Sequence, residues 1–241
     1  MKLTLRTLAA CAATAFALAS ASAQELFIYD NTTANTGSFF ANGGAALVGA
    51  NTITTLVADD LTPISGYGGM AVSNIYFSVV NGNATAVSAR PRLRIYSADG
   101  AGGAPGTFLA GFTFTAISFA GNSGSSFFFH PTGFNVPSGT FWMGLTFDNN
   151  SGATGATATQ LNNLGMALFN PPNIGTSADS MFQTTAAGDF LVNNPAGNLF
   201  NFGGNPPASA FFGLTVSVPE PASMTLVGLG IAGLIFFRRR K

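Results

Sequence analysis

Apolar residues at every second position, in short segments bounded by Gly and Asn, most constrain what this chain can fold into. Segment 141–147 carries Phe, Met, Leu and Phe at its odd positions, and segment 212–218 alternates in the same way. Such alternation places one face of a β-strand in a core. No helical period of useful length occurs between the two ends of the chain. Because the 24 Phe residues also need burial, we expect an all-β fold, a single β-sandwich or jelly-roll-like domain.

Turn clusters rich in Gly and Asn divide this pattern into strands. The clusters at 81–83, 121–124 and 149–152 are typical examples. No repeat of fixed period is present, which argues against a solenoid or a propeller. Strands are expected near residues 25–30, 52–58, 71–80, 86–97, 107–115, 125–130, 140–148, 164–169 and 211–218.

The first 23 residues have the three parts of a secretory signal peptide. Lys2 and Arg6 precede an apolar stretch at 8–18, and a small-residue cleavage site ends at Ala23. Cleavage there would make Gln24 the first mature residue.

The alternative for this end of the chain is a lipid on Cys11, which follows a lipobox-like sequence. Only four residues separate Cys11 from Arg6, too few for an apolar core. Cys11 is the single cysteine, so the mature chain is expected to have no disulfide, thiol nucleophile or Cys-ligated metal.

At the C-terminus, an uncharged run follows the triplet Pro219, Glu220 and Pro221. The run covers residues 222–237, and as a helix it would be about 24 Å long, against a hydrocarbon core of about 30 Å. Local thinning of the bilayer or snorkelling of basic side chains can make up the difference, so we expect a transmembrane helix there. By the positive-inside rule the basic cluster stays cytoplasmic and stops the helix; it consists of Arg238, Arg239, Arg240 and Lys241.

This order of parts resembles the PEP-CTERM sorting domain over residues 219–241. The resemblance implies an exosortase partner, a membrane cysteine protease that cleaves near the Pro-Glu-Pro motif. It also implies an exported precursor held in inner-membrane lipid, and a mature form at the cell surface or outside the cell, where an exopolysaccharide is a further candidate partner. The same tail occurs on ice-binding proteins, an association that describes the tail and not the domain. An ordinary single-pass anchor is the alternative.

Residues 24–218 between these ends form one predicted extracytoplasmic domain, and it is acidic. Its three arginines stand against eight carboxylates, which gives a net charge of −5 and no electrostatic basis for binding nucleic acid. Segments 57–61, 94–96 and 103–106 resemble parts of the choice-of-anchor β-domains. That resemblance implies a surface β-sandwich with no assigned activity.

Patterns that carry catalysis or bind cofactors are scarce, so we expect no catalytic residue, cofactor or metal. The Gly-x-Gly-x-x-Gly pattern at 228–233 lies inside the predicted membrane run and not after a strand. Asp59 and Asp60 are adjacent, would point to opposite faces of a strand, and are expected in a turn. Asp148 opens a turn sequence that lacks EF-hand spacing.

Two features support a carbohydrate-binding hypothesis beside the expected non-enzymatic, structural or adhesive role at the cell surface or in an extracellular (biofilm) matrix. Trp142 falls opposite the buried set of its strand, where the indole would stack on a sugar unless a loop covers it. Arg90, Arg92 and Arg94 alternate and therefore share one face. That face either binds an acidic polysaccharide or pairs with nearby aspartates. A polysaccharide-active enzyme, which needs two carboxylates in a cleft, is the third hypothesis.

Overall fold

Strands dominate the computed structural model, which describes residues 23–204 and 207–219. The all-β prediction is confirmed, whereas the finer sandwich or jelly-roll assignment stays a prediction. Within the described ranges no helix has the length and apolar character needed to cross a membrane. The predicted signal peptide and the predicted helix 222–237 lie outside the described residues. Contacts between Cα atoms separate the unit Phe27–Val216 from the two ends of the chain, and the fold below is that of this unit.

The described elements are short and follow one another closely. In chain order they are β1 (Ala23–Asp30), β2 (Asn35–Ala41), β3 (Ala46–Val48), β4 (Asn51–Ile53), β5 (Val57–Leu61), β6 (Val72–Asn81), β7 (Val87–Ser97), η1 (Ala101–Gly103), β8 (Phe108–Thr113), β9 (Ile117–Phe119), β10 (Ser123–Phe129), β11 (Phe141–Asp148), α2 (Ala158–Asn162), β12 (Leu164–Phe169), β13 (Ser180–Thr184), β14 (Gly197–Asn201), β15 (Ser209–Ala210) and β16 (Phe212–Pro219).

Eight of the nine predicted strands correspond to one strand each, and the exception is the segment 52–58. It is two strands, β4 and β5, because Thr54 between them turns its backbone and side chain toward β11. Thr54 N donates to Phe147 O (2.9 Å), and Phe147 N donates to Thr54 Oγ1 (3.0 Å). Strands β2, β3, β9, β13, β14 and β15 were not predicted, since they are too short or too rich in Asn, Gly and Ser to alternate clearly.

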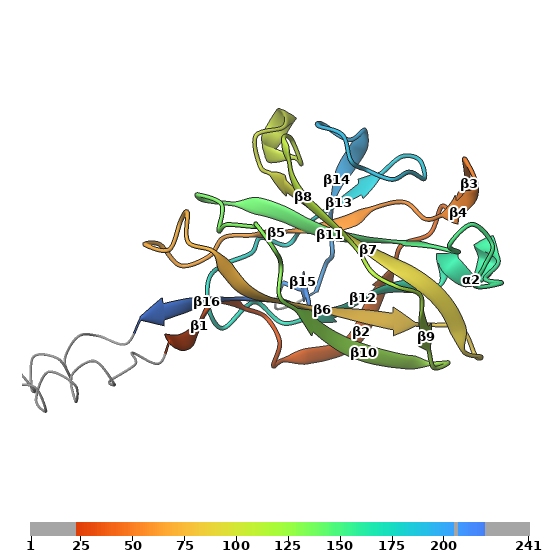
Figure 1. Ribbon diagram of the computed structural model, residues 1–241, viewed down its shortest axis with the longest axis horizontal. Helices are drawn as coiled ribbons and strands as arrows, with labels where there is room; N and C mark the ends of the chain where they lie inside the picture. The colour runs from red at the N-terminus through yellow and green to blue at the C-terminus, as the bar shows by residue number, and fades with distance from the viewer. Residues whose placement is uncertain (1–22, 205–206, 220–241) are drawn as a thin grey trace, which may run out of the picture. The chain divides into compact units, whose positions relative to one another are not determined.

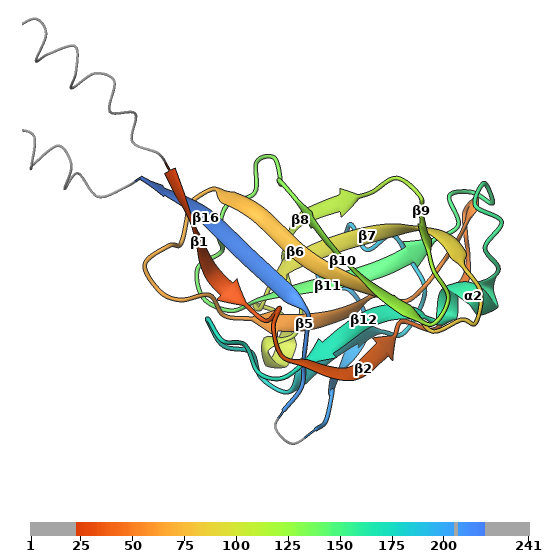
Figure 2. The same cartoon turned by 90° about the horizontal axis from the view of Figure 1, so that it is seen from below.

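The strands form two curled sheets. Sheet A has the order β1-β16-β6-β12-β15, with β10 paired to β6 and β2 paired to β12. Sheet B has the order β14-β13-β5-β11-β4-β3, with β7 paired to β11 and both β8 and β9 paired to β7. Figure 1 shows them as two layers, β5, β11 and β7 lying above β6, β10 and β12. Figure 2 is seen from the side of sheet A.

A cluster of phenylalanines joins the facing sides of the two sheets. Phe77 of β6 is 1% exposed, and its ring centroid lies 5.2 Å from that of Phe114, just after β8. Within sheet A the Phe77 ring stacks on Phe127 of β10 at 5.4 Å. Phe129 of β10 meets Phe112 of β8 edge to face at 4.9 Å. Edge-to-face and offset contacts between aromatic rings add stability beyond the area they bury, which explains where the many Phe side chains go.

Strand β11 is buried on both faces. The predicted core set at its odd positions is confirmed, because each of these four side chains is 0% exposed: Phe141, Met143, Leu145 and Phe147. On the opposite face Trp142 is 3% exposed and Thr146 and Asp148 are 0% exposed. Something must therefore cover the outer face of sheet B, and that cover determines what the predicted site residues can do.

Candidate functional site

Arg90, Arg92 and Arg94 lie together on the outer face of sheet B, as their alternation predicted. The register of β7 against β11 places Arg90 directly opposite Asp148. Arg90 Nε donates to Asp148 Oδ1 at 2.9 Å, and Arg92 Nε donates to the other oxygen of the same carboxylate. Asp148 also accepts a hydrogen bond from Asn150 N at 2.7 Å, so this fully buried carboxylate is paired and satisfied.

The loop 185–196, between β13 and β14, covers this arginine face. Arg92 Nη1 donates to the carboxylate of Asp189, and Arg94 Nε donates to Asp189 O at 2.8 Å. Tyr96, two residues after Arg94 on the same face of β7, donates from its Oη to Phe190 O. Arg94 is 1% exposed, and burial, together with the charge of Arg92, lowers its pKa to about 10. The arginine stripe is therefore not an open cationic surface for an acidic polysaccharide.

Trp142 is covered in the same way. Its Nε1 donates to Gly103 O at 2.8 Å, in the loop before β8, and its ring meets Phe182 edge-on with centroids 6.3 Å apart. Leu56, Ala58 and Tyr96 complete this buried cluster. The indole has no face open for a sugar to stack on, so the structure corrects the suggestion of a glycan contact at Trp142.

Asp59 and Asp60 lie in strand β5 and not in a turn, so that expectation was wrong. Asp59 is 0% exposed; its Oδ2 accepts from Ala210 N at 2.7 Å and its Oδ1 from Ser177 Oγ at 3.2 Å. Both oxygens of Asp60 accept from Ala178 N at 3.2 Å. Burial, and then the neighbouring charge of Asp60, raise the pKa of Asp59 well above its usual value, and burial also raises the pKa of Asp60.

These two carboxyl groups serve as internal acceptors. Asp59 ties β5 of sheet B to β15 of sheet A through the backbone of Ala210. A glycosidase needs two carboxyl groups converging on one open cleft, and this pair does not provide that arrangement. Across residues 23–204 and 207–219, no three His, Cys, Asp or Glu side chains gather closely enough to hold a metal ion.

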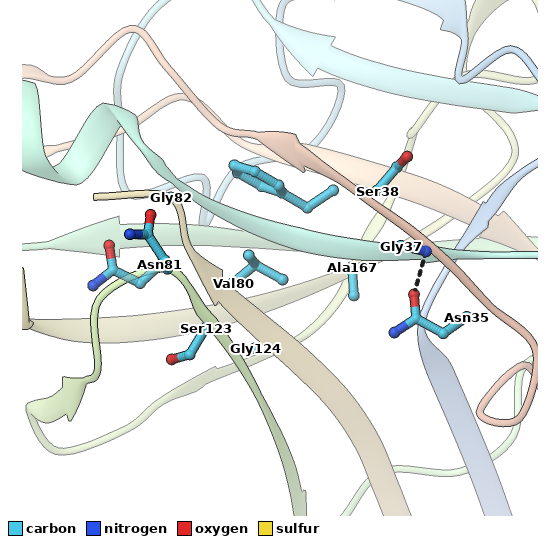
Figure 3. A pocket seen from close by; sticks show the side chains of 11 residues that line it. Asn35, Gly37, Ser38, Val80, Asn81, Gly82, Ser123, Gly124 and Ala167 are labelled. Atoms are coloured by element: carbon cyan, nitrogen blue, oxygen red, sulfur yellow. Dashed lines mark hydrogen bonds between the residues drawn. The ribbon is translucent and has the colours of Figure 1, made fainter. Parts of the chain in front are cut away.

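An open groove with a volume of about 380 Å³ lies on the outer face of sheet A. We call it the Asn/Ser groove. Figure 3 shows Asn35 and Ser38 on one side of it, from β2, and Ser123 and Gly124 on the other, from β10. Its lining residues are all uncharged: Asn35, Gly37, Ser38, Phe39, Val80, Asn81, Gly82, Asn122, Ser123, Gly124 and Ala167.

Sequence reasoning missed this groove. Asn81, Gly82 and the segment 121–124 read as turn residues, and β2 was not predicted as a strand at all. The lining residues come from segments at least forty positions apart, so no local motif marks them.

The Pro219–Pro221 motif, the run 222–237 and the cluster 238–241 belong to the tail, of which only Pro219, the last residue of β16, is among the described residues. The predicted cleavage site lies at the first described residues, Ala23 and Gln24 of β1. The processing of both ends stays a prediction.

Comparison with solved structures gives a distant similarity. The cysteine protease and lectin-like domains of Cwp84, a surface layer associated protein of Clostridium difficile, share 11% sequence identity with this chain, at a TM-score of 0.41. The match covers 70% of this chain and 33% of that one, so the chain spans about a third of the matched structure. A likeness of this size carries no argument about function. No curated protein matches the chain.

Comparison with protein families gives a specific result. The model of the PEP-CTERM protein-sorting motif matches residues 217–241, which contain the triplet, the uncharged run and the basic cluster. The resemblance drawn from the sequence is thereby confirmed: this chain is a protein that carries a PEP-CTERM sorting motif at its C-terminus.

Proposed function

We propose that this chain is an exported, non-enzymatic protein of the cell surface or extracellular matrix, sorted by an exosortase through residues 219–241. The match of the sorting motif carries the proposal. In this reading the signal peptide is removed between Ala23 and Gln24, and the helix 222–237 holds the precursor in the inner membrane. The basic residues 238–241 stay cytoplasmic until the protease acts near Pro219–Pro221. The mature domain, a single β-sandwich of the jelly-roll type, then has a structural or adhesive role.

The internal use of reactive side chains supports a non-enzymatic role. Asp59, Asp60 and Asp148 are engaged in hydrogen bonds that hold strands and loops together. The buried arginines on β7 do the same for the loop 185–196. A domain of this kind uses its charged groups for rigidity, which suits a scaffold exposed outside the cell without disulfides.

Replacing Glu220 with Ala tests the sorting proposal. Export should continue, since the signal is untouched, but the unprocessed form should accumulate in the inner membrane of the native host. Mass spectrometry of the mature termini and membrane fractionation measure this. Glu25→Ala is the matched control, because Glu25 is the only other glutamate of the chain and is exposed. If the wild-type protein retains residues 222–241 in its cell-surface pool, the tail is an ordinary anchor and the proposal is wrong.

A second candidate function is carbohydrate binding, favoured by the Asn/Ser groove on sheet A. The residues that first raised this hypothesis, Trp142 and the arginine stripe, are covered by loops. The groove is open and offers amide, hydroxyl and apolar groups together, the combination that small-molecule sites use.

A further inference from the structure

We propose that the Asn/Ser groove binds an uncharged oligosaccharide, an inference that rests on the second function proposed above and specifies its site and ligand class. The groove combines an apolar floor, two polar walls and a lack of charge. Each of these features follows from how β2, β6, β10 and β12 are arranged.

The floor of the groove exists because β12 leaves β6 soon after pairing with it. Their register includes only Leu164 with Asn81 and Gly165 with Val80. Beyond that point Ala167 N donates to the side-chain oxygen of Ser78 at 3.1 Å, in place of a backbone partner on β6. The side chains of Val80 and Ala167 then form a shallow apolar floor between the separated strands. A sugar ring presents C–H groups that fit such a floor.

Strand β2 forms one wall through Asn35 and Phe39, which lie on the same face of the strand as the floor residue Ala167. Asn35 Oδ1 accepts from Gly37 N at 2.8 Å, which fixes the side chain and leaves its amide nitrogen without a partner in the described part of the chain. Ser38 is exposed at the rim, and its side chain points away from the floor (Figure 3). Phe39 lies beside them and is 38% exposed; the register of β2 places it opposite Ala167.

The turn before β10 forms the other wall. Asn122 has a positive φ of 49°, a conformation that Asn adopts more readily than other non-glycine residues. Its backbone is held by a hydrogen bond from Asn122 N to Asn83 O at 2.8 Å, and Asn83 is in turn bonded to Asn81 and Gln160. The Asn122 side chain makes no hydrogen bond within the described residues, so a rigid backbone presents a free amide to the groove.

Charge selects the class of ligand. The lining residues carry no charge, and the mature domain has a net charge of −5. The arginines that could bind a carboxylate are on the other sheet and pair with Asp148 and Asp189. Amide and hydroxyl groups over an apolar floor match the alternating O–H and C–H groups of a neutral sugar, whereas an acidic sugar would find no partner for its charge.

Filling the groove tests the proposal. Gly124 of β10 has an ordinary φ, and a Cβ there would touch only Val80 Cγ2, at 3.6 Å. Gly124→Leu therefore places a side chain over the floor without a backbone clash. The matched control is Ser126→Leu, two residues along the same exposed face of β10 and outside the groove. A second variant, Asn122→Gly, removes one polar group, and Gly keeps the positive φ at residue 122.

Calorimetric titration of the full-length chain in detergent gives the readout, with maltohexaose, cellohexaose and chitohexaose as uncharged probes and hexagalacturonate as the acidic one. We expect saturable binding of at least one uncharged probe by the wild type and by Ser126→Leu, and none by Gly124→Leu. Asn122→Gly should weaken binding about fivefold, the effect of one net hydrogen bond. The Asn122→Gly variant gives the answer if Gly124→Leu does not fold.

Three results would overturn the proposal: no binding of any uncharged probe, binding that Gly124→Leu leaves unchanged, or preference for hexagalacturonate. None of these three results tests the sorting proposal, because the titration measures sugar binding by the unprocessed protein. Conversely, the Glu220→Ala experiment measures processing of the tail, so its failure leaves the groove proposal standing.

Discussion

Replacing Asp59 with Asn should make the domain more stable at pH 8 and leave its stability nearly unchanged at pH 4. The side chain of Asp59 is fully buried, and within the described residues no cation pairs with it. The groups that act on its carboxyl group are Asp60 on the same strand, Tyr29 on β1 and the hydroxyl of Ser177. An ionised carboxylate in this place loses hydration and gains no opposite charge.

The sign of the pH dependence follows from the raised pKa of Asp59. In the unfolded chain an Asp titrates near pH 3.9. Between that value and the higher folded-state pKa, the folded protein binds more protons than the unfolded chain, so its stability falls as pH rises. In this window the free energy of unfolding falls by up to about 1.4 kcal/mol for each pH unit. Above the folded-state pKa it falls no further on account of Asp59. Below pH 3.9 the full stability is present.

Asparagine keeps the shape of this site and removes the ionisation. Its Oδ1 can accept from Ala210 N, and its Nδ2 can donate to Ser177 Oγ, where the wild-type contacts measure 2.7 and 3.2 Å. The variant should therefore lose most of the downward slope, and a smaller slope of the same sign should remain from Asp60, whose pKa is also raised by burial.

Urea unfolding at a series of pH values from 4 to 9 measures the effect. Trp142, the single tryptophan of the chain, is buried, and its fluorescence reports the transition. Asp99→Asn is the control, because hydrogen bonds from Ser97 and Thr107 lower the pKa of Asp99 to about 2. Ionised Asp99 therefore stabilises the folded protein, and this stabilisation is lost as pH falls. If the difference in stability between Asp59→Asn and wild type is the same at pH 4 and pH 8, Asp59 does not titrate with a raised pKa and the reasoning is refuted.

Two further predictions concern stability and use the same unfolding assay. Asp148→Ala removes the buried carboxylate that Arg90 and Arg92 share and should cost about 3–5 kcal/mol, whereas Asp189→Ala should cost under about 1 kcal/mol because that side chain is 56% exposed. Equal losses of stability in the two variants would contradict the argument that a buried ion pair matters more than an exposed one. Phe77→Ala should cost about 3–5 kcal/mol from the centre of the phenylalanine cluster, and Phe128→Ala, 63% exposed on the same sheet, about 1 kcal/mol or less. A larger loss at Phe128 would place the core elsewhere.

Period-two alternation was enough to predict which residues share a face, but not what lies over that face. It placed Arg90, Arg92 and Arg94 together and put Trp142 opposite the core set, and the structure agrees. The cover comes from the loops before β8 and β14, whose contacts with these side chains join residues 39 to 97 positions apart. Such contacts depend on the whole fold, and no local pattern encodes them.

Asp59 and Asp60 show a related limit. Asp is rare in strands, and two together favour a turn from composition alone. Here the strand is stabilised by neighbours on both sides, since β5 lies between β11 and β13. A backbone N–H of the other sheet then meets the Asp59 carboxyl group. Tertiary pairing overrides local preference, and only the assembled sheets reveal the partner.

The distribution of charge connects the domain to its proposed place outside the cell. All three arginines of residues 24–218 are used internally, so surface carboxylates such as Asp99 act without a compensating cation. At an ionic strength of 0.1 M this repulsion extends about 10 Å from the surface and disfavours acidic polymers. Adhesion to a matrix must then use uncharged contacts, and the Asn/Ser groove presents such contacts on a rigid sheet. A protein delivered to the surface by its tail would in this way hold neutral glycans and leave acidic ones free.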